Sequence, residues 1–205
     1  MMTIEEYIKD PCKASSLPYW KTISYQIPNN IKVELEKYNK ESNEACEKYF
    51  KVIHYLDNIK TSVLPIDFIL TSISIEEYVS HINSCYDEIR ISVEELKEYQ
   101  NHRVYGETLW VAIKDNRNNK IVATGIGEMD NIVREGILEW IQISKEYRRQ
   151  GFGKYIVKEL FHRMKDKAKF VMVSGKLLSK TNPLSLYEKC GFINKQIWNV
   201  YKINK

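Results

Sequence analysis

The sequence predicts a mixed α/β domain that follows an N-terminal extension. Three observations support this fold class. From Pro65 onward, β-branched runs alternate with helical segments, two capping boxes mark helix starts, and a glycine-rich turn links a strand to a helix. Residues 1–65 lack this regularity, so we expect them to form an extension packed on a domain of residues 66–205.

Composition narrows the class of protein. The chain has 205 residues, of which 43% are hydrophobic and 28% charged, as in soluble globular proteins. No apolar run approaches the roughly 18 residues of a membrane span, and the acidic start, "MMTIEEYIKDPCK", does not resemble a secretory signal. We therefore expect a cytoplasmic protein with no membrane partner. Four scattered cysteines indicate reduced thiols, and frequent Ile, Lys, Asn and Tyr suggest an AT-rich bacterial genome. A net charge of +4 is too small to indicate a nucleic-acid partner.

The extension is expected to contain three elements. Residues 3–10 ("TIEEYIKD") suggest a helix of one or two turns that Pro11 ends. Residues 15–30, with two prolines and several aromatic or β-branched side chains, suggest extended chain. Apolar residues in 43–56 ("NEACEKYFKVIHYL") recur close to helical spacing, which predicts a helix.

The domain is expected to follow the order β, α, α, β, β, β, loop, α, β, α, β. Ser74 with Glu77, and Ser92 with Glu95, form capping boxes at the two early helices. A turn, "NRNN", joins two strands into a hairpin. In order, the segments are a strand at 66–74, helices at 75–86 and 93–100, strands at 108–115, 120–129 and 136–144, a helix at 154–164, a strand at 169–176, a helix at 182–192 and a strand at 195–203.

The stretch "YRRQGFGKY", residues 147–155, has the composition of a phosphate-binding turn, because glycines permit close approach and a helix start presents unpaired N–H groups. It is not a dinucleotide fingerprint, since Ile156 stands where the third glycine belongs. It is not a nucleoside-triphosphate loop, since Arg148 and Tyr155 replace the first glycine and the hydroxyl.

The arrangement R-x-x-G-x-G, from Arg148 to Gly153, resembles the signature of the GNAT superfamily of N-acetyltransferases. "LYEKCGF", residues 186–192, is similar to the late helix-to-strand junction of that family, and the element order agrees. The resemblance covers about residues 66–205. It implies a GNAT fold, with a mixed central sheet splayed after its fourth strand and helices on both faces. It also implies an N-acetyltransferase that moves an acetyl group from the cosubstrate acetyl-CoA to a primary amine by direct attack, without a metal. Family members are often dimers, so a homodimer is possible.

The resemblance also implies a cofactor site. Loop amides would bind the pyrophosphate, and the strand edge around Ile141 to Ile143 would pair with the pantetheine arm. Asn182, which precedes Pro183, has two interpretations: a helix N-cap or a cofactor contact. The cofactor-binding set is Ile141, Gln142, Ile143, Arg148, Arg149, Gln150, Gly151, Phe152, Gly153, Lys154 and Asn182. The chain departs from the family at Lys145, Arg149 and Lys180, where proline, glycine and asparagine are usual.

Two residues are candidates for catalysis. On an alternating strand, Glu139 shares a face with Ile137, Ile141 and Ile143 and is the polar exception there. The family often places a glutamate on this strand as general base, although a partnered structural carboxylate is an alternative. Tyr187, in "LYEKCGF", stands where the family has a tyrosine directed at the thioester, which implies a general acid. The alternative is a core tyrosine packed beside Phe192.

Other candidates are weaker. His81 and Cys85 lie four residues apart on a predicted helix but lack further ligands nearby, so we expect a buried thiol and a surface histidine rather than a metal site. The basic run 162–169 suggests a solvated helix end or a contact with the 3′-phosphate of the cofactor. The acceptor amine, in a small molecule or in a peptide or protein, is open. A binding or regulatory protein that keeps the acyl-CoA pocket without catalysis is the alternative function.

Overall fold

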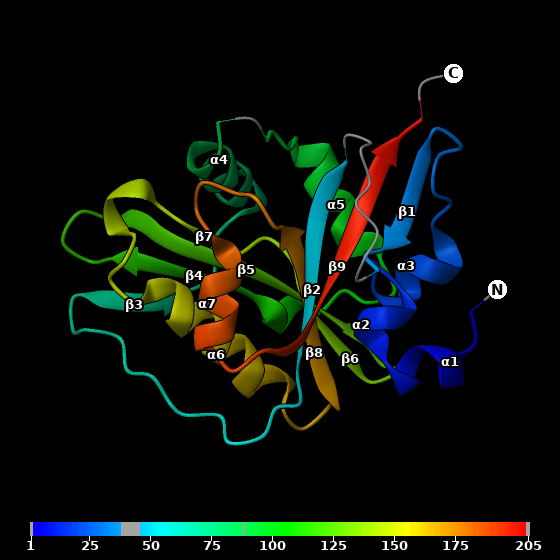
Figure 1. Ribbon diagram of the computed structural model, residues 1–205. Coiled ribbons are helices and arrows are strands. Elements are labelled where there is room, and N and C mark those ends of the chain that lie inside the picture. Colours follow the sequence, from blue (N-terminus) through cyan, green and yellow to red (C-terminus); the bar gives the residue numbers. More distant parts are fainter. Residues whose placement is uncertain (1, 38–45, 88, 204–205) are drawn as a thin grey trace. The chain divides into compact units, whose positions relative to one another are not determined.

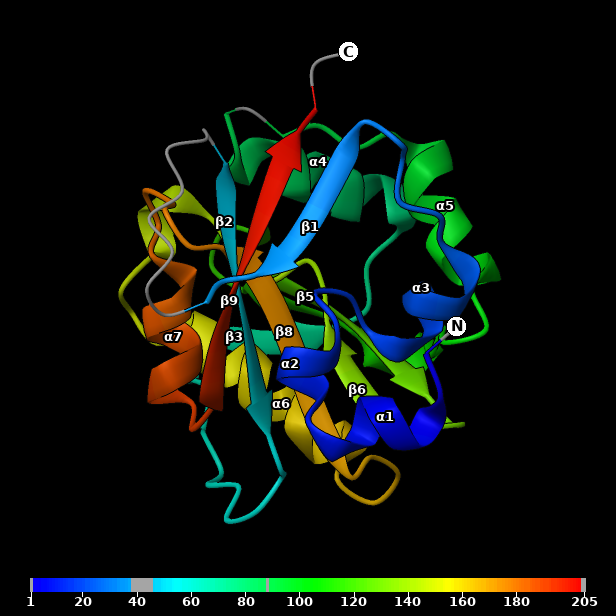
Figure 2. The same ribbon diagram turned by 45° about the vertical axis from the view of Figure 1, so that its right-hand side comes forward.

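The computed structural model describes residues 2–37, 46–87 and 89–203. The chain divides into two compact units. Figures 1 and 2 label helices and strands of both units. Unit 1 comprises residues 1–55 and 170–205, and unit 2 comprises residues 56–169. Within the described ranges, none of the helices has both the length and the apolar character needed to cross a membrane.

Unit 1 contains an antiparallel sheet with the strand order β1, β9, β2, β8. The strands are β1 (Ile31–Leu35), β2 (Glu47–His54), β8 (Phe170–Lys176) and β9 (Ile193–Lys202). The helices of this unit are α1 (Ile4–Lys9), α2 (Pro11–Ala14), α3 (Tyr19–Ser24) and α7 (Pro183–Lys189). Strands β1 and β2, which precede Pro65 in the sequence, therefore pair with strands from the end of the chain.

A buried lysine attaches the N-terminal segment to this sheet. Lys51, on β2, is 1% exposed, and its Nζ donates hydrogen bonds to the Tyr7 hydroxyl at 3.0 Å and to the carbonyls of Ser15 at 2.9 Å and Leu17 at 2.7 Å. The indole N–H of Trp198 donates to the Cys12 carbonyl at 2.9 Å. Because a buried ammonium group is costly without acceptors, these contacts fix the segment on β2 and β9.

Two expectations for the extension are wrong, and one is confirmed. The helix at 3–10 is present as α1, with a capping box between Thr3 and Glu6. The helix expected at 43–56 is instead strand β2; residues 43–45 lie outside the described residues. The error has a physical cause: the second half of β2 is buried on both faces, so its apolar residues do not alternate along the strand, and their spacing fits a helix as well as a strand. Residues 19–24, expected to be extended, form α3.

Unit 2 contains the antiparallel strand order β3, β4, β5, β6, with β7 also paired to β5. The strands are β3 (Phe68–Thr71), β4 (Trp110–Asp115), β5 (Lys120–Asp130), β6 (Glu135–Leu138) and β7 (Gln142–Ile143). The helices are α4 (Ile75–Cys85), α5 (Val93–Asn101) and α6 (Phe152–Met164), with the short 3-10 turns η1 (Glu107–Leu109) and η2 (Lys145–Tyr147). Both expected capping boxes are present, Ser74 with Glu77 and Ser92 with Glu95.

Helices cover both faces of the unit 2 sheet. A Cβ added at Gly125 would lie 2.3 Å from Ile156 of α6, so this face of β5 meets α6. The next residue, Ile126, packs with Tyr78 and Ile82 of α4 and Leu96 of α5. Successive residues of β5 therefore face opposite helix layers. A residue on a neighbouring strand faces the same layer as the β5 residue that it pairs with.

Candidate functional site

The strand expected at 136–144 is interrupted by a bulge. Leu138 pairs with Gly127 and Gln142 pairs with Thr124, so four steps along one strand match three along the other. One extra residue reverses the alternation, which places Ile137 on the α4/α5 face and Ile143 on the α6 face. The common face expected for Glu139, Ile137, Ile141 and Ile143 is therefore wrong.

Glu139 lies in this bulge. Its side chain is partly exposed, and its backbone N–H donates to the Ile126 carbonyl at 2.9 Å. Bulges re-aim side chains at the point where the ladder is disrupted. The sequence placed Glu139 within one continuous strand, whereas the structure places it just after β6, in the interruption that precedes β7.

The backbone of Ile143 points away from β5. Ser144 N–H donates to the Val122 carbonyl at 2.9 Å, and hydrogen-bonded positions alternate in an antiparallel pair, so the Ile143 groups face the opposite edge. The Arg148 guanidinium binds this edge: Nε donates to the Ile143 carbonyl at 3.2 Å, and Nη2 donates to the Cys85 carbonyl at 3.0 Å. Arg148 thus joins the end of α4, the β7 edge and the start of the glycine loop.

The glycine loop opens α6 in a conformation that suits an anion. Gly151 is the N-cap of this helix, with φ of 94°, and Arg149 has φ of 64°. As a glycine, Gly151 has no side chain to cap the first-turn N–H groups, and a Cβ placed there would meet no atom of the described residues within 4 Å. Arg149, Gln150 and Lys154 are exposed, whereas Phe152 and Gly153 are buried. The loop therefore presents backbone donors, the positive end of a helix and two cations.

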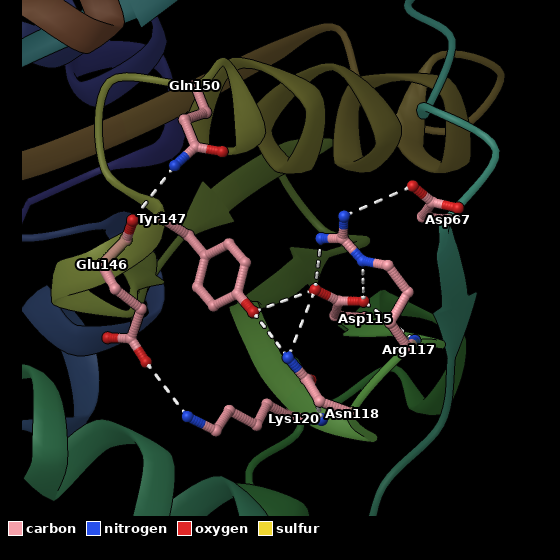
Figure 3. A network of polar contacts seen from close by, with 8 residues as sticks. All are labelled: Asp67, Asp115, Arg117, Asn118, Lys120, Glu146, Tyr147 and Gln150. Carbon is pink, nitrogen blue, oxygen red and sulfur yellow. Dashed lines mark hydrogen bonds and ion pairs between the residues drawn. The ribbon is translucent and has the colours of Figure 1, made fainter.

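A buried carboxylate positions the chain entering this loop (Figure 3). Asp115, at the end of β4, accepts from the Arg117 side chain at 2.9 and 2.7 Å and from the Tyr147 hydroxyl at 2.9 Å. The Arg117 side chain is the main reason that the pKa of Asp115 is well below its usual range. The Tyr147 ring also packs edge-on against Phe152, at the start of α6, with 6.1 Å between centroids. Asp115 is therefore ionised at neutral pH and holds Tyr147 beside the loop.

We expect Tyr147→Phe to weaken the binding of acetyl-CoA severalfold, because it removes the hydrogen bond to Asp115 and leaves the ring packing in place. Isothermal calorimetry with CoA measures the change. Tyr105→Phe is the matched control, since no hydrogen bond of the Tyr105 hydroxyl is found among the described residues. Equal affinities of a folded Tyr147→Phe protein and the wild type would show that this hydroxyl does not set the loop.

A neutral histidine forms a second link beneath β7. His81 Nδ1 lies 2.9 Å from Thr124 Oγ1, and His81 Nε2 lies 3.0 Å from Ser144 Oγ. Burial lowers the pKa of His81 to about 4, so the ring is uncharged at pH 7. The expected surface histidine is wrong, because His81 is 6% exposed, whereas Cys85 is buried as expected. Among the described residues, no group of three His, Cys, Asp or Glu side chains is placed to hold a metal ion.

The remaining site residues belong to unit 1. Asn182 is the N-cap of α7 and accepts a hydrogen bond from Ser185 N–H at 3.4 Å, with Pro183 at the first helical position. The capping interpretation is confirmed, and the cofactor contact stays a prediction. Tyr187 is 6% exposed, and its ring lies 5.5 Å from Phe192 and 6.0 Å from Phe50, between centroids. Its ring packing beside Phe192 is thus as expected, and its catalytic role stays a prediction.

Sequence reasoning missed three residues that support the site: Asp115, Thr124 and Ser144. They lie far along the chain from the loop or helix that they contact, and each is an ordinary polar residue at a strand end or within a strand. The four-residue spacing of His81 and Cys85 indicates that both lie on one face of a helix. It does not identify Thr124 and Ser144 as the partners of His81.

Comparisons with known proteins bear on the family and the fold. Residues 105–194 match the family model described as an acetyltransferase (GNAT) domain. A GCN5-related N-acetyltransferase from Sphaerobacter thermophilus is similar in structure, with a TM-score of 0.63 and 14% identity over 78% of this chain and 53% of that chain. A conserved protein of unknown function from Staphylococcus epidermidis is similar over 100% of this chain and 82% of that chain, with a TM-score of 0.56 and 12% identity.

A chain in the NatC complex, solved with Gag peptide and CoA, is also similar, with a TM-score of 0.53 and 16% identity over 68% of this chain and 100% of that chain. No curated protein matches the sequence. This chain spans about half the length of the Sphaerobacter protein. At these identities the structural likeness concerns the fold, and it confirms the GNAT fold expected from the sequence.

Proposed function

We propose that this chain, whose residues 105–194 match the family model of the GNAT acetyltransferase domain, transfers an acetyl group from acetyl-CoA to a primary amine. The family and the fold support acyl transfer from acyl-CoA to an amine in general. The choice of acetyl and the details of the site are our proposal. The observation that carries it is the glycine loop at the start of α6, held in its conformation next to a bulged strand.

The residues present fit the diphosphate of acetyl-CoA. The space next to Gly151 is open among the described residues, and Gly151 itself has no side chain to cap the adjoining first-turn N–H groups. Backbone donors and the helix dipole favour an anion, and the exposed Arg149 and Lys154 add positive charge. We propose that the backbone of Arg149 to Lys154 binds the pyrophosphate.

The outward edge of β7 fits the pantetheine arm. Ile143 directs its backbone away from β5, and its carbonyl is already bound by Arg148 Nε. That leaves the Ile143 N–H as the donor for an extended, amide-containing ligand, and Ile141 and Gln142 as its neighbours along the edge. Arg148 is then a positioning residue rather than a phosphate ligand, which refines its expected role.

The proposed reaction needs no covalent enzyme intermediate. The nitrogen of a neutral amine attacks the thioester carbonyl carbon, a C–N bond forms, and the C–S bond breaks. One proton leaves the amine nitrogen, and one is needed by the sulfur. We assign the first transfer to Glu139, through a water molecule, and the second to Tyr187.

Replacing Glu139 with Gln tests the proposed base. We expect kcat/KM to fall by about 100-fold or more, because the amide does not accept the amine proton. Glu146→Gln is the matched control, since Glu146 is an exposed carboxylate near the loop. Full turnover of a folded Glu139→Gln enzyme at every pH would remove Glu139 from this role.

The overall function is tested by thiol release from acetyl-CoA with a panel of amines that includes amino acids, polyamines, aminoglycosides and peptides. We expect thiol release to depend on one class of amine and to match the acetylated product detected by mass spectrometry. Tight CoA binding without turnover on any amine would instead favour a binding or regulatory protein that retains the fold.

A further inference from the structure

We propose that strand β1 is a self-association edge, through which two copies of this chain pair antiparallel about a two-fold axis at Val33. The partner is a second copy because the backbone, the charged face and the apolar face of β1 are each complementary to themselves. The inference concerns assembly and does not depend on the proposed activity.

The first argument is the direction of the β1 backbone groups. Glu36 N–H donates to the Ile197 carbonyl, and Ile203 N–H donates to the Asn30 carbonyl, each at 2.8 Å. Since hydrogen-bonded positions alternate in an antiparallel pair, Lys32 and Glu34 direct their groups to β9. Ile31, Val33 and Leu35 therefore direct theirs to the other edge. Among the residues that the structure describes in unit 1, β1 pairs with β9 alone (Figure 2).

The second argument is that a two-fold axis at Val33 satisfies this edge completely. Val33 then lies opposite Val33 of the second copy, and Ile31 lies opposite Leu35. Both are pairs of outward-directed residues, so each can exchange two backbone hydrogen bonds. An axis at Lys32 or at Glu34 would also pair two outward-directed residues, but it would place Lys32 or Glu34 opposite its own copy and leave Leu35 or Ile31 without an outward partner within the strand.

The third argument is charge complementarity at the same register. Lys32 and Glu34 lie on one face of β1, with side chains 54% and 48% exposed and their charged groups 2.8 Å apart. With the axis at Val33, Lys32 of each copy lies opposite Glu34 of the other. Opposite charges directly across a pair of strands stabilise it, and like charges destabilise it.

The fourth argument is the opposite face, which is apolar. Ile31, Val33 and Leu35 are half-buried there, and Trp198 of β9 lies opposite Leu35 in the β1–β9 register. Pairing would align Ile31 with Leu35, and Val33 with itself, on this face. Proline and bulges, which block pairing at an edge, are absent within Ile31–Leu35; charged side chains are present, but at this register Lys32 and Glu34 lie opposite each other across the pair.

The decisive test uses charge-reversed variants of the full chain, measured by analytical ultracentrifugation over a range of concentrations. We expect wild-type protein to form a dimer, and Lys32→Glu alone or Glu34→Lys alone to weaken it about tenfold or more, because each places like charges opposite each other. A mixture of the two single variants should form a heterodimer, and the double variant Lys32→Glu/Glu34→Lys should dimerise again, because both restore opposite charges at every pair.

A backbone variant tests the edge independently of charge. Val33→Pro removes an N–H that points away from β9, so the β1–β9 pairing keeps its hydrogen bonds while the outer edge loses its central donor. We expect a monomer with a nearly unchanged melting temperature. A wild-type protein that stays monomeric at several hundred micromolar would overturn the proposal. A dimer whose dissociation constant is the same in the wild type and the charge variants would also overturn it. The charge variants therefore still test the proposal if Val33→Pro does not fold.

Discussion

Gly151→Val should lose about 10- to 100-fold in affinity for acetyl-CoA while the protein stays folded. Gly151 has φ of 94°, a region that β-branched residues avoid. Nothing lies within 4 Å of a Cβ at this position, so valine meets no clash in the free protein. We expect the loop to relax from the left-handed conformation. Binding would then require the strained conformation again, and the new side chain would occupy the space where we place the diphosphate.

Calorimetry with CoA, together with a melting curve, measures this loss. Gly106→Ala is the matched control, because Gly106 lies in the same unit with φ of −141°, and its Cβ would lie 3.0 Å from the nearest atom of the buried Leu109 side chain, a contact whose cost the melting curve measures. Gly151→Ala should give an intermediate loss, since alanine tolerates positive φ better than valine does. Unchanged affinity in a folded Gly151→Val protein would contradict the assignment of the loop as the diphosphate site.

The parts of the fold that could be predicted from the sequence are those set by local interactions. The capping box of Ser74 and Glu77 spans four residues, and both of its hydrogen bonds are present. The hairpin turn at 116–119 is also local, with Asn119 in the left-handed conformation at φ of 58°. The glycine loop belongs to this group, because its chemistry resides in the backbone and in residues close in sequence.

The errors arise where long-range pairing decides the structure. Strand β2 lies between β8 and β9, whose residues are more than a hundred positions away, and this pairing overrides the helical spacing within 43–56. The bulge at Glu139 exists because β6 and β7 pair with β5 in two different registers. A periodic pattern assumes one register, so it assigned Glu139 to a face that the strand does not maintain.

The support of the candidate site was also not predictable from the sequence. Asp115 and Tyr147 are joined by a hydrogen bond across 32 positions, and His81 and Ser144 across 63. Each contact requires that separate elements already be folded together. The motif therefore identified the groups proposed to bind the cofactor, whereas the structure identified the side chains that hold those groups in place.

Tyr187→Phe should lower turnover by about 10- to 1000-fold with little change in acetyl-CoA binding, because it removes only the hydroxyl that we propose donates a proton to the leaving sulfur. The aromatic packing of the Tyr187 ring against Phe192 and Phe50 is available to phenylalanine as well, so the fold should be retained. The expected signature is a loss in kcat, rather than a rise in KM for acetyl-CoA.

The leaving group provides a sharper readout of this role. If Tyr187 donates a proton to sulfur, an acetyl thioester of a more acidic thiol needs that donor less, and the defect of Tyr187→Phe should shrink with such a substrate. Tyr49→Phe is the matched control in the same unit, since its hydroxyl bonds to the exposed Glu47 side chain at 3.0 Å, and it should leave turnover unchanged with either thioester. A Tyr187→Phe enzyme with wild-type turnover would mean that Tyr187 acts only in packing, and that the sulfur takes its proton from water.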